Sequence, residues 1–88
     1  TMTLEETLNI LNNAVTASVM DATEYTLCTK STDTLKDIGL DSLDWSIVLI
    51  YIEDEVLLSE EVITELGEII NTGGTVQEMM EFFNSHGL

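Results

Sequence analysis

The chain has 88 residues, 17 of them acidic and two basic, and its formal net charge is −15. This charge repels phosphate backbones and anionic lipid heads, which excludes nucleic acids and membrane surfaces as partners and favours basic patches on other proteins. The length allows a single domain, residues 1–88, and the apolar share of 44% argues against disorder. Repulsion between copies predicts a monomer.

Cysteine content and hydropathy bear on the compartment. The single cysteine, Cys28, excludes an internal disulfide, as is typical of a reducing compartment. The longest uninterrupted apolar run, residues 47–52, is too short to span a bilayer. The chain does not begin with the pattern of a secretion signal, so we expect a cytoplasmic protein.

The first predicted helix runs from about residue 3 to Met20. Residues 3–6 form a capping box, in which a threonine hydroxyl and a glutamate carboxylate accept hydrogen bonds from free backbone N–H groups. Leucine and valine then recur at spacings of four, three and four, which predicts one apolar stripe made of Leu4, Leu8, Leu11 and Val15.

Residues 21–40 are predicted as a long loop. The apolar periodicity is lost there, and Thr, Ser and Asp dominate. Gly39 is expected to have a positive φ, and Leu35 and Ile38 are expected to pack against the core. A connection of this length in a compact domain is normally functional.

Three further helices are predicted, which makes the fold an all-α four-helix bundle with three longer helices and a shorter third one. The second runs from Ser42 to about Leu57. The third begins after Ser59, has an apolar stripe that is broken near Gly67, and stops at residues 71–74. The last has a capping box at residues 75–78 and ends at Gly87. Their expected core residues have helical spacing and are Trp45, Val48, Leu49, Ile52 and Val56, then Val62, Leu66, Ile69 and Ile70, and finally Val76, Met79, Met80 and Phe83.

The residue patterns of enzymes and of metal sites are missing from the sequence. The only histidine, His86, lies two residues from the C-terminus, where chain ends fray, so no base is positioned to activate a nucleophile. The acidic residues lack the spacing of a calcium-binding EF-hand, and no glycine-rich phosphate loop occurs. We therefore expect no catalytic residues, no metal site and a protein that is not an enzyme.

Residues 35–44 hold the most informative pattern. A glycine-containing turn leads to Ser42 at the start of the second helix, between Asp41 and Asp44. Negative charge at this position is favoured by the positive end of the helix dipole. Taken alone, the pattern indicates Ser42 as an ordinary helix N-cap.

Together with the charge and the order of the helices, residues 38–44, Ile-Gly-Leu-Asp-Ser-Leu-Asp, resemble the acyl carrier protein family, whose motif is Asp-Ser-Leu after a Leu-Gly-x element. The resemblance extends over the whole chain, including the long loop and the Thr-Val-Gln start of the last helix. It implies that a phosphopantetheinyl transferase attaches a 4′-phosphopantetheine arm from coenzyme A to Ser42. The thiol of the arm would carry acyl groups as thioesters and deliver them to fatty-acid or polyketide-type enzymes.

The resemblance also implies a partner-docking surface for the transferase, for an acyl-loading enzyme and for synthases with basic docking surfaces. The residues assigned to this surface are Asp41, Leu43, Asp44, Ile47, Ile50, Glu53 and Asp54. Five positions after the modified serine, where the family usually has a glutamate, this chain has Ile47. The recognition helix is therefore more apolar than usual, which predicts specialised partners.

Trp45 and Leu49 are assigned to an acyl pocket. Trp45 replaces the small residue that is common in the family, and its ring is expected to limit or shape the cargo; the alternative is that Trp45 is ordinary core. Two other functions stay open. One alternative to the acyl carrier is an aminoacyl or peptidyl carrier. The other is an acidic helical interaction module that has no prosthetic group and binds a basic partner through the same apolar strip.

Overall fold

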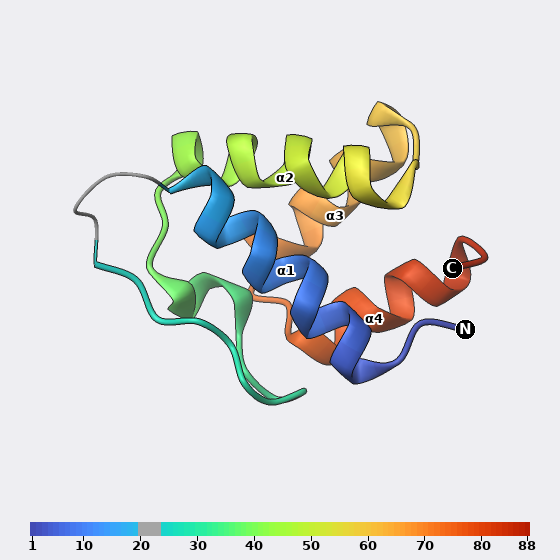
Figure 1. The fold of residues 1–88 in the computed structure, drawn as a ribbon, viewed down its shortest axis with the longest axis horizontal. Helices are drawn as coiled ribbons and strands as arrows, with labels where there is room; N and C mark the ends of the chain where they lie inside the picture. The colour runs from blue at the N-terminus through green and yellow to red at the C-terminus, as the bar shows by residue number, and fades with distance from the viewer. Residues whose placement is uncertain (20–23) are drawn as a thin grey trace.

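The computed structural model describes residues 1–19 and 24–88 as four helices that pack into a bundle (Figure 1). Their bounds are α1 Leu4–Ser18, α2 Ser42–Val56, α3 Glu60–Asn71 and α4 Val76–Ser85, and a short 3-10 helix, η1 Leu35–Ile38, precedes α2. No strand occurs among the described residues, which confirms the predicted all-α bundle. The expectation that the first helix reaches Met20 lies outside the described residues.

The hydrogen bonds predicted at the helix starts are present. At α1, Thr3 Oγ1 accepts from the Glu6 N–H at 3.1 Å and Glu6 Oε1 accepts from the Thr3 N–H at 3.0 Å. The corresponding distances between Thr75 and Glu78 at α4 are 3.2 and 3.1 Å. The pKa of Glu6 is lowered, most of all by the hydrogen bond from the Thr3 backbone N–H and then by a hydrogen bond with the Thr3 side chain. Both capping boxes are confirmed.

The helix α3 continues through Gly67 and ends at Asn71, where the sequence predicts its stop; the predicted break near Gly67 does not interrupt the helix. Glycine inside a helix costs about 0.5–1 kcal/mol relative to alanine, and burial of Ile63, Leu66 and Ile70 on the inner face of α3 offsets this cost. As a result α3 has 12 residues and α4 has 10, so the last helix rather than the third is the shortest.

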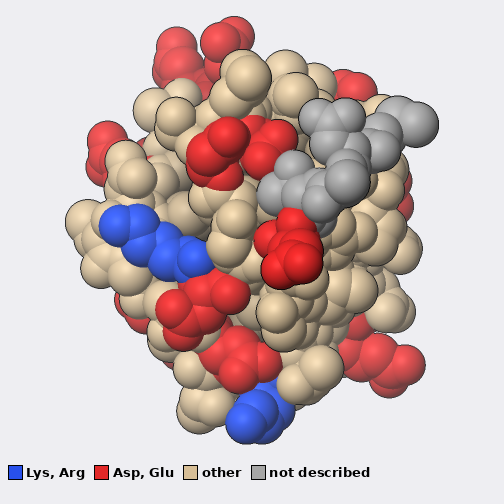
Figure 2. Space-filling model, turned by 90° about the vertical axis from the view of Figure 1, so that its left-hand side faces the viewer, with Lys and Arg blue, Asp and Glu red and all other residues tan. Residues whose placement is uncertain are grey.

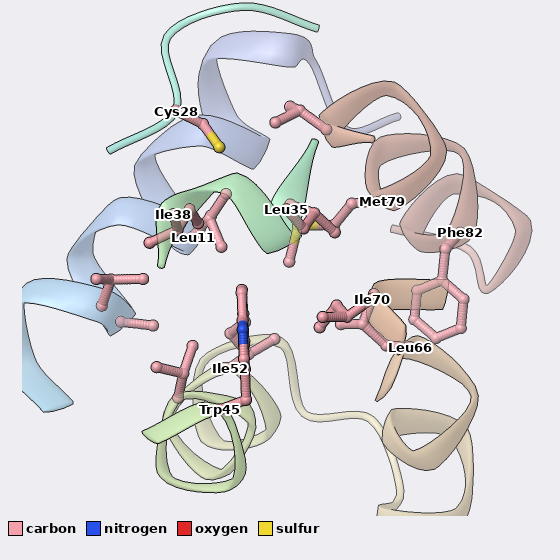
Figure 3. Close-up of a cluster of buried hydrophobic side chains, with 14 of the residues drawn as sticks. Leu11, Cys28, Leu35, Ile38, Trp45, Ile52, Leu66, Ile70, Met79 and Phe82 are labelled. Carbon is pink, nitrogen blue, oxygen red and sulfur yellow. The ribbon is translucent and has the colours of Figure 1, made fainter. Parts of the chain in front are cut away.

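The core lies between the four helices and η1, with side chains from all five elements pointing to one centre (Figure 3). Leu35 and Ile38 of η1 are buried, as predicted, and they pack with Ile52 of α2 and Phe83 of α4 in the same cluster. Partly buried side chains pack around this cluster, among them Leu49, Val62 and Ile69, which were predicted as core. Met80, also predicted as core, is half-buried as well. The helices therefore turn their apolar stripes inward nearly as the periodicity predicts.

The described part of the long loop is tied to the bundle by its backbone. The N–H groups of Val76 and Gln77 donate to the carbonyls of Asp33 and Ser31 at 3.0 and 2.9 Å, and the Leu35 N–H donates to the Gly74 carbonyl at 2.9 Å. This pairing lays the loop beside the start of α4. The loop prediction holds in outline, but η1 and these bonds give residues 31–38 a defined structure that the sequence pattern did not indicate.

Gly74 is the position at which this arrangement tolerates a side chain least. It is buried, and a Cβ atom there would lie 2.6 Å from the carbonyl oxygen of Ile69 and also contact the Ile69 side chain. We expect Gly74→Ala to lower the free energy of unfolding by about 1–3 kcal/mol, because a rigid backbone atom has to move. Urea unfolding measures the change.

Gly67→Ala is the matched control. A Cβ atom there would meet only Leu49 Cδ1, at an ordinary 3.5 Å, and alanine favours the helix. We expect this variant to raise the free energy of unfolding by about 0.5–1 kcal/mol. Equal destabilisation by both substitutions would contradict the steric explanation.

Candidate functional site

The site predicted from the sequence lies where the loop enters α2. Gly39 has a φ of 93°, as expected, and its N–H donates to the Lys36 carbonyl at 3.2 Å, which closes η1 and turns the chain toward α2. Asp41 is the helix cap, and its Oδ1 accepts from the Asp44 N–H at 2.8 Å. The interpretation of Ser42 as an ordinary cap is therefore wrong, because the aspartate before it holds that position.

Ser42 is the first residue of α2 and is exposed. Its hydroxyl forms no hydrogen bond with any of the described residues, whereas the Ser46 hydroxyl one turn later donates to the Leu43 carbonyl at 2.7 Å. The first backbone N–H groups of a helix carry partial positive charge and bind phosphate groups well. The Ser42 oxygen is thus presented to solvent at a position that suits a phosphate ester.

A half-open cleft of about 290 Å³ lies beside Ser42. Trp45 and Leu49 of α2, Leu40 before it and Ile70 of α3 form its apolar wall, and its polar lining comes from Lys36, Ser42, Ser46 and Asn71. Its volume is just below the usual range for small-molecule sites, which begins at about 300 Å³. Trp45 is only 8% exposed and belongs to the core cluster, so the two interpretations of this residue are compatible: one ring packs in the core and borders the cleft.

The apolar residues assigned to docking are on the surface of α2. Leu43, Ile50 and Ile47 are 69%, 58% and 37% exposed. Their spacings of four and three residues place them on one side of the helix, together with Asp54. The acidic residues of the assignment border them: Asp41 and Asp54 are exposed, and Asp44 and Glu53 are half-buried. We call Leu43, Ile47 and Ile50 the apolar strip.

Two exposed apolar residues near this strip were not predicted from the sequence. Tyr51 follows Ile47 by four residues, and Leu57, with a φ of 58°, ends the helix. Both belong to a helix that is apolar on nearly every side, so periodicity could not separate exposed from buried positions. The spacing of four residues between Ile47 and Tyr51 was the one sequence feature that could have placed Tyr51 beside the apolar strip.

Acidic side chains dominate the electrostatics of the end of the molecule from which α2 begins (Figure 2). Two separate basic groups interrupt them, in agreement with the two lysines of the sequence. Within the described ranges the one contact at ion-pair distance joins His86 Nε2 to Glu65 Oε2 at 3.9 Å. Few carboxylates of the described residues are thus neutralised by neighbours, and their negative field extends into solvent.

His86 and the acidic residues form no reactive constellation in the part of the chain that the structure covers. The ring of His86 lies 4.7 Å from that of Phe82, a packing contact at the end of α4. No group of three or more potential metal ligands occurs among residues 1–19 and 24–88. None of the described helices has the length and apolar character required to cross a bilayer.

Cys28 is buried, and its backbone carbonyl accepts from Asn12 Nδ2 at 2.9 Å. Burial, and after it the nearby negative charges of Asp33 and Asp37, raise the pKa of the Cys28 thiol to about 11. We expect the native protein to resist alkylation at neutral pH and the urea-unfolded protein to react fully, because the thiolate is the reactive form. Rapid modification of the native thiol would contradict this expectation.

The raised pKa also predicts a dependence of stability on pH. Between about pH 9 and 11 the unfolded chain releases a thiol proton that the native protein retains, so the free energy of unfolding falls as the pH rises through this window. The expected loss is on the order of 2 kcal/mol. Comparison of the pH profiles of wild type and Cys28→Ala isolates this contribution from other groups that titrate there.

No family model, curated protein or solved structure matches this chain.

Proposed function

We propose that this chain is an acyl carrier that holds acyl intermediates as thioesters on a 4′-phosphopantetheine arm attached to Ser42. The observation that carries the proposal is the exposed Ser42 hydroxyl, which has no partner among the described residues and lies at the first turn of α2 beside a cleft with an apolar wall. A covalently attached cargo needs both features: an oxygen that accepts the arm and a surface that receives the cargo.

The location of the serine supports attachment by another enzyme. A phosphodiester on Ser42 would lie at the free N–H groups of the first turn and at the positive end of the helix dipole. The chain needs no base of its own there, because a phosphopantetheinyl transferase supplies the activation and coenzyme A the arm. The carrier therefore performs no catalysis itself and works in the cytoplasm, where both are present.

The apolar strip and the acidic residues around it support delivery to partner enzymes. Exposed Leu43, Ile47 and Ile50 can be buried against an apolar patch, while Asp41, Asp54 and Glu53 meet basic residues around that patch. The transferase, an acyl-loading enzyme and fatty-acid or polyketide-type synthases would use this surface in turn. Ile47 in place of a glutamate shifts the contact from charge toward apolar burial.

Intact-mass spectrometry tests the proposal. The protein is incubated with coenzyme A and a transferase of broad specificity, and we expect a gain of one phosphopantetheinyl group. Ser42→Ala should gain none, whereas Ser46→Ala, which removes the neighbouring exposed serine of the same helix, should be modified like wild type. An unmodified wild-type mass, or equal modification of Ser42→Ala, would refute the carrier function.

The apolar strip favours one second candidate. If the chain accepts no arm, these exposed residues on a strongly acidic helix fit an interaction module that binds a basic partner without a prosthetic group. If it accepts the arm, the choice between acyl and aminoacyl cargo depends on which loading enzyme acts on the primed protein.

A further inference from the structure

The cleft beside Ser42 differs in its charge from the four other cavities described for residues 1–19 and 24–88. The four other described cavities are each lined by at least one acidic residue: Glu55; Glu24 and Asp37; Asp33 and Asp37; and Glu53 and Glu60. The cleft beside Ser42 has none, although 17 of the 88 residues are acidic. Its charged lining residue is Lys36, one of the two basic residues of the chain.

The fold holds the backbone of Lys36 in place while its side chain is exposed. Leu35, directly before Lys36, and Ile38, two residues after it, are almost completely buried in the core. The Lys36 carbonyl accepts a hydrogen bond from the Gly39 N–H. No described carboxylate lies within ion-pair distance of the Lys36 ammonium group. An anchored lysine without an ion-pair partner on the described surface is available to an anion from outside the chain.

The other lysine has a different environment. Lys30 lines a cavity together with Asp33 and Asp37, and its charge contributes to lowering the pKa of Asp33, after the hydrogen bonds from the Thr29 and Lys30 N–H groups. Lys30 therefore has acidic neighbours, and its cavity does not include Ser42. This makes Lys30 an internal control for any effect of positive charge alone.

We infer that Lys36 is a positioning residue that binds the phosphodiester of the arm on Ser42 and directs the arm along the cleft wall of Trp45 and Leu49. This inference rests on the proposed carrier function and adds to it a specific counter-ion. A lysine ammonium group is a compact charge with three donors and binds phosphate oxygens readily. Because the cleft has no carboxylate, the phosphodiester meets attraction from Lys36 without repulsion from the lining.

The two-lysine composition allows a direct test by NMR. With ¹³C-labelled lysine, the ε-methylene groups of Lys36 and Lys30 give two signals, assigned with Lys36→Gln and Lys30→Gln. We expect attachment of the arm to move the Lys36 signal and to leave the Lys30 signal in place. Added salt should reduce this movement, because it screens the contact.

The phosphorus resonance of the arm gives the reciprocal measurement. We expect it to differ between primed wild type and primed Lys36→Gln, to differ most in Lys36→Glu, and to be unchanged in Lys30→Gln. Trp45 emission of the unprimed variants should match wild type, since an exposed substitution leaves the core intact. Priming of Ser42 with both lysine signals unmoved would overturn this inference alone, whereas a chain that takes no arm overturns it together with the carrier function.

Discussion

Replacing Phe83 by alanine will lower the free energy of unfolding by about 3–5 kcal/mol, the usual cost of truncating a buried aromatic side chain. Phe83 is fully buried in α4, within the cluster that joins α4 to η1 and to the other helices. A domain of this size has a total stability of about 4–13 kcal/mol. Each 1 kcal/mol lowers the Tm of a domain of this size by about 4–8 °C, so we expect the variant to be partly or fully unfolded at 37 °C.

Urea unfolding followed by tryptophan emission measures this effect, because Trp45 is the only tryptophan and is buried in the same core. Tyr51→Ala is the matched control, since it also removes an aromatic ring but from a position that is 46% exposed. We expect this control to change the free energy of unfolding by about 0.5 kcal/mol or less. Similar costs for both substitutions would mean that the core is not organised as described.

With Ser42 as the proposed attachment site, replacing Leu43 by serine will lower kcat/KM for attachment of the arm by about fivefold or more. Leu43 follows Ser42 directly, is 69% exposed and begins the apolar strip, so a transferase that modifies Ser42, as proposed, would cover it. Loss of one well-buried interface anchor costs more than about 1 kcal/mol, and 1.4 kcal/mol corresponds to a factor of about ten. The rate of arm attachment, followed by intact mass, gives this value.

Leu57→Ser is the control for this prediction. Leu57 is the most exposed leucine, at 86%, but it lies at the opposite end of α2 from Ser42. We expect its replacement to leave the rate of attachment unchanged and both variants to keep the stability of wild type. Equal losses in the two variants would indicate a general effect of surface hydrophobicity, and an unchanged rate in Leu43→Ser would remove the strip from the transferase contact.

Local features of the chain were predictable because they depend on residues near in sequence. Each capping box needs a threonine and a glutamate three residues apart, and both formed as expected. The left-handed φ of Gly39 follows from the absence of a Cβ atom. The start of α2 at Ser42 was likewise predictable from the polar residues that precede an apolar run.

Other features depend on contacts between distant residues. η1 forms because Leu35 and Ile38 are buried against the helices and because the loop backbone pairs with residues 74–77. The continuation of α3 through Gly67 depends on the burial of its inner face, which outweighs the local preference of one glycine. Taken alone, the sequence pattern indicated Ser42 as the cap, whereas Asp41 holds that position, because both residue types cap helices well.

The sequence by itself determined the helical class, the approximate helix bounds, the strong negative charge and the position of one serine at a helix start, since each follows from composition or short-range spacing. The tertiary structure decided which apolar residues of α2 face solvent. Val48 and Ile52 are buried while Ile47 and Ile50 are exposed, although all four have similar side chains. The neighbouring helices cover only one side of α2, and which side is covered depends on packing between segments far apart in the chain.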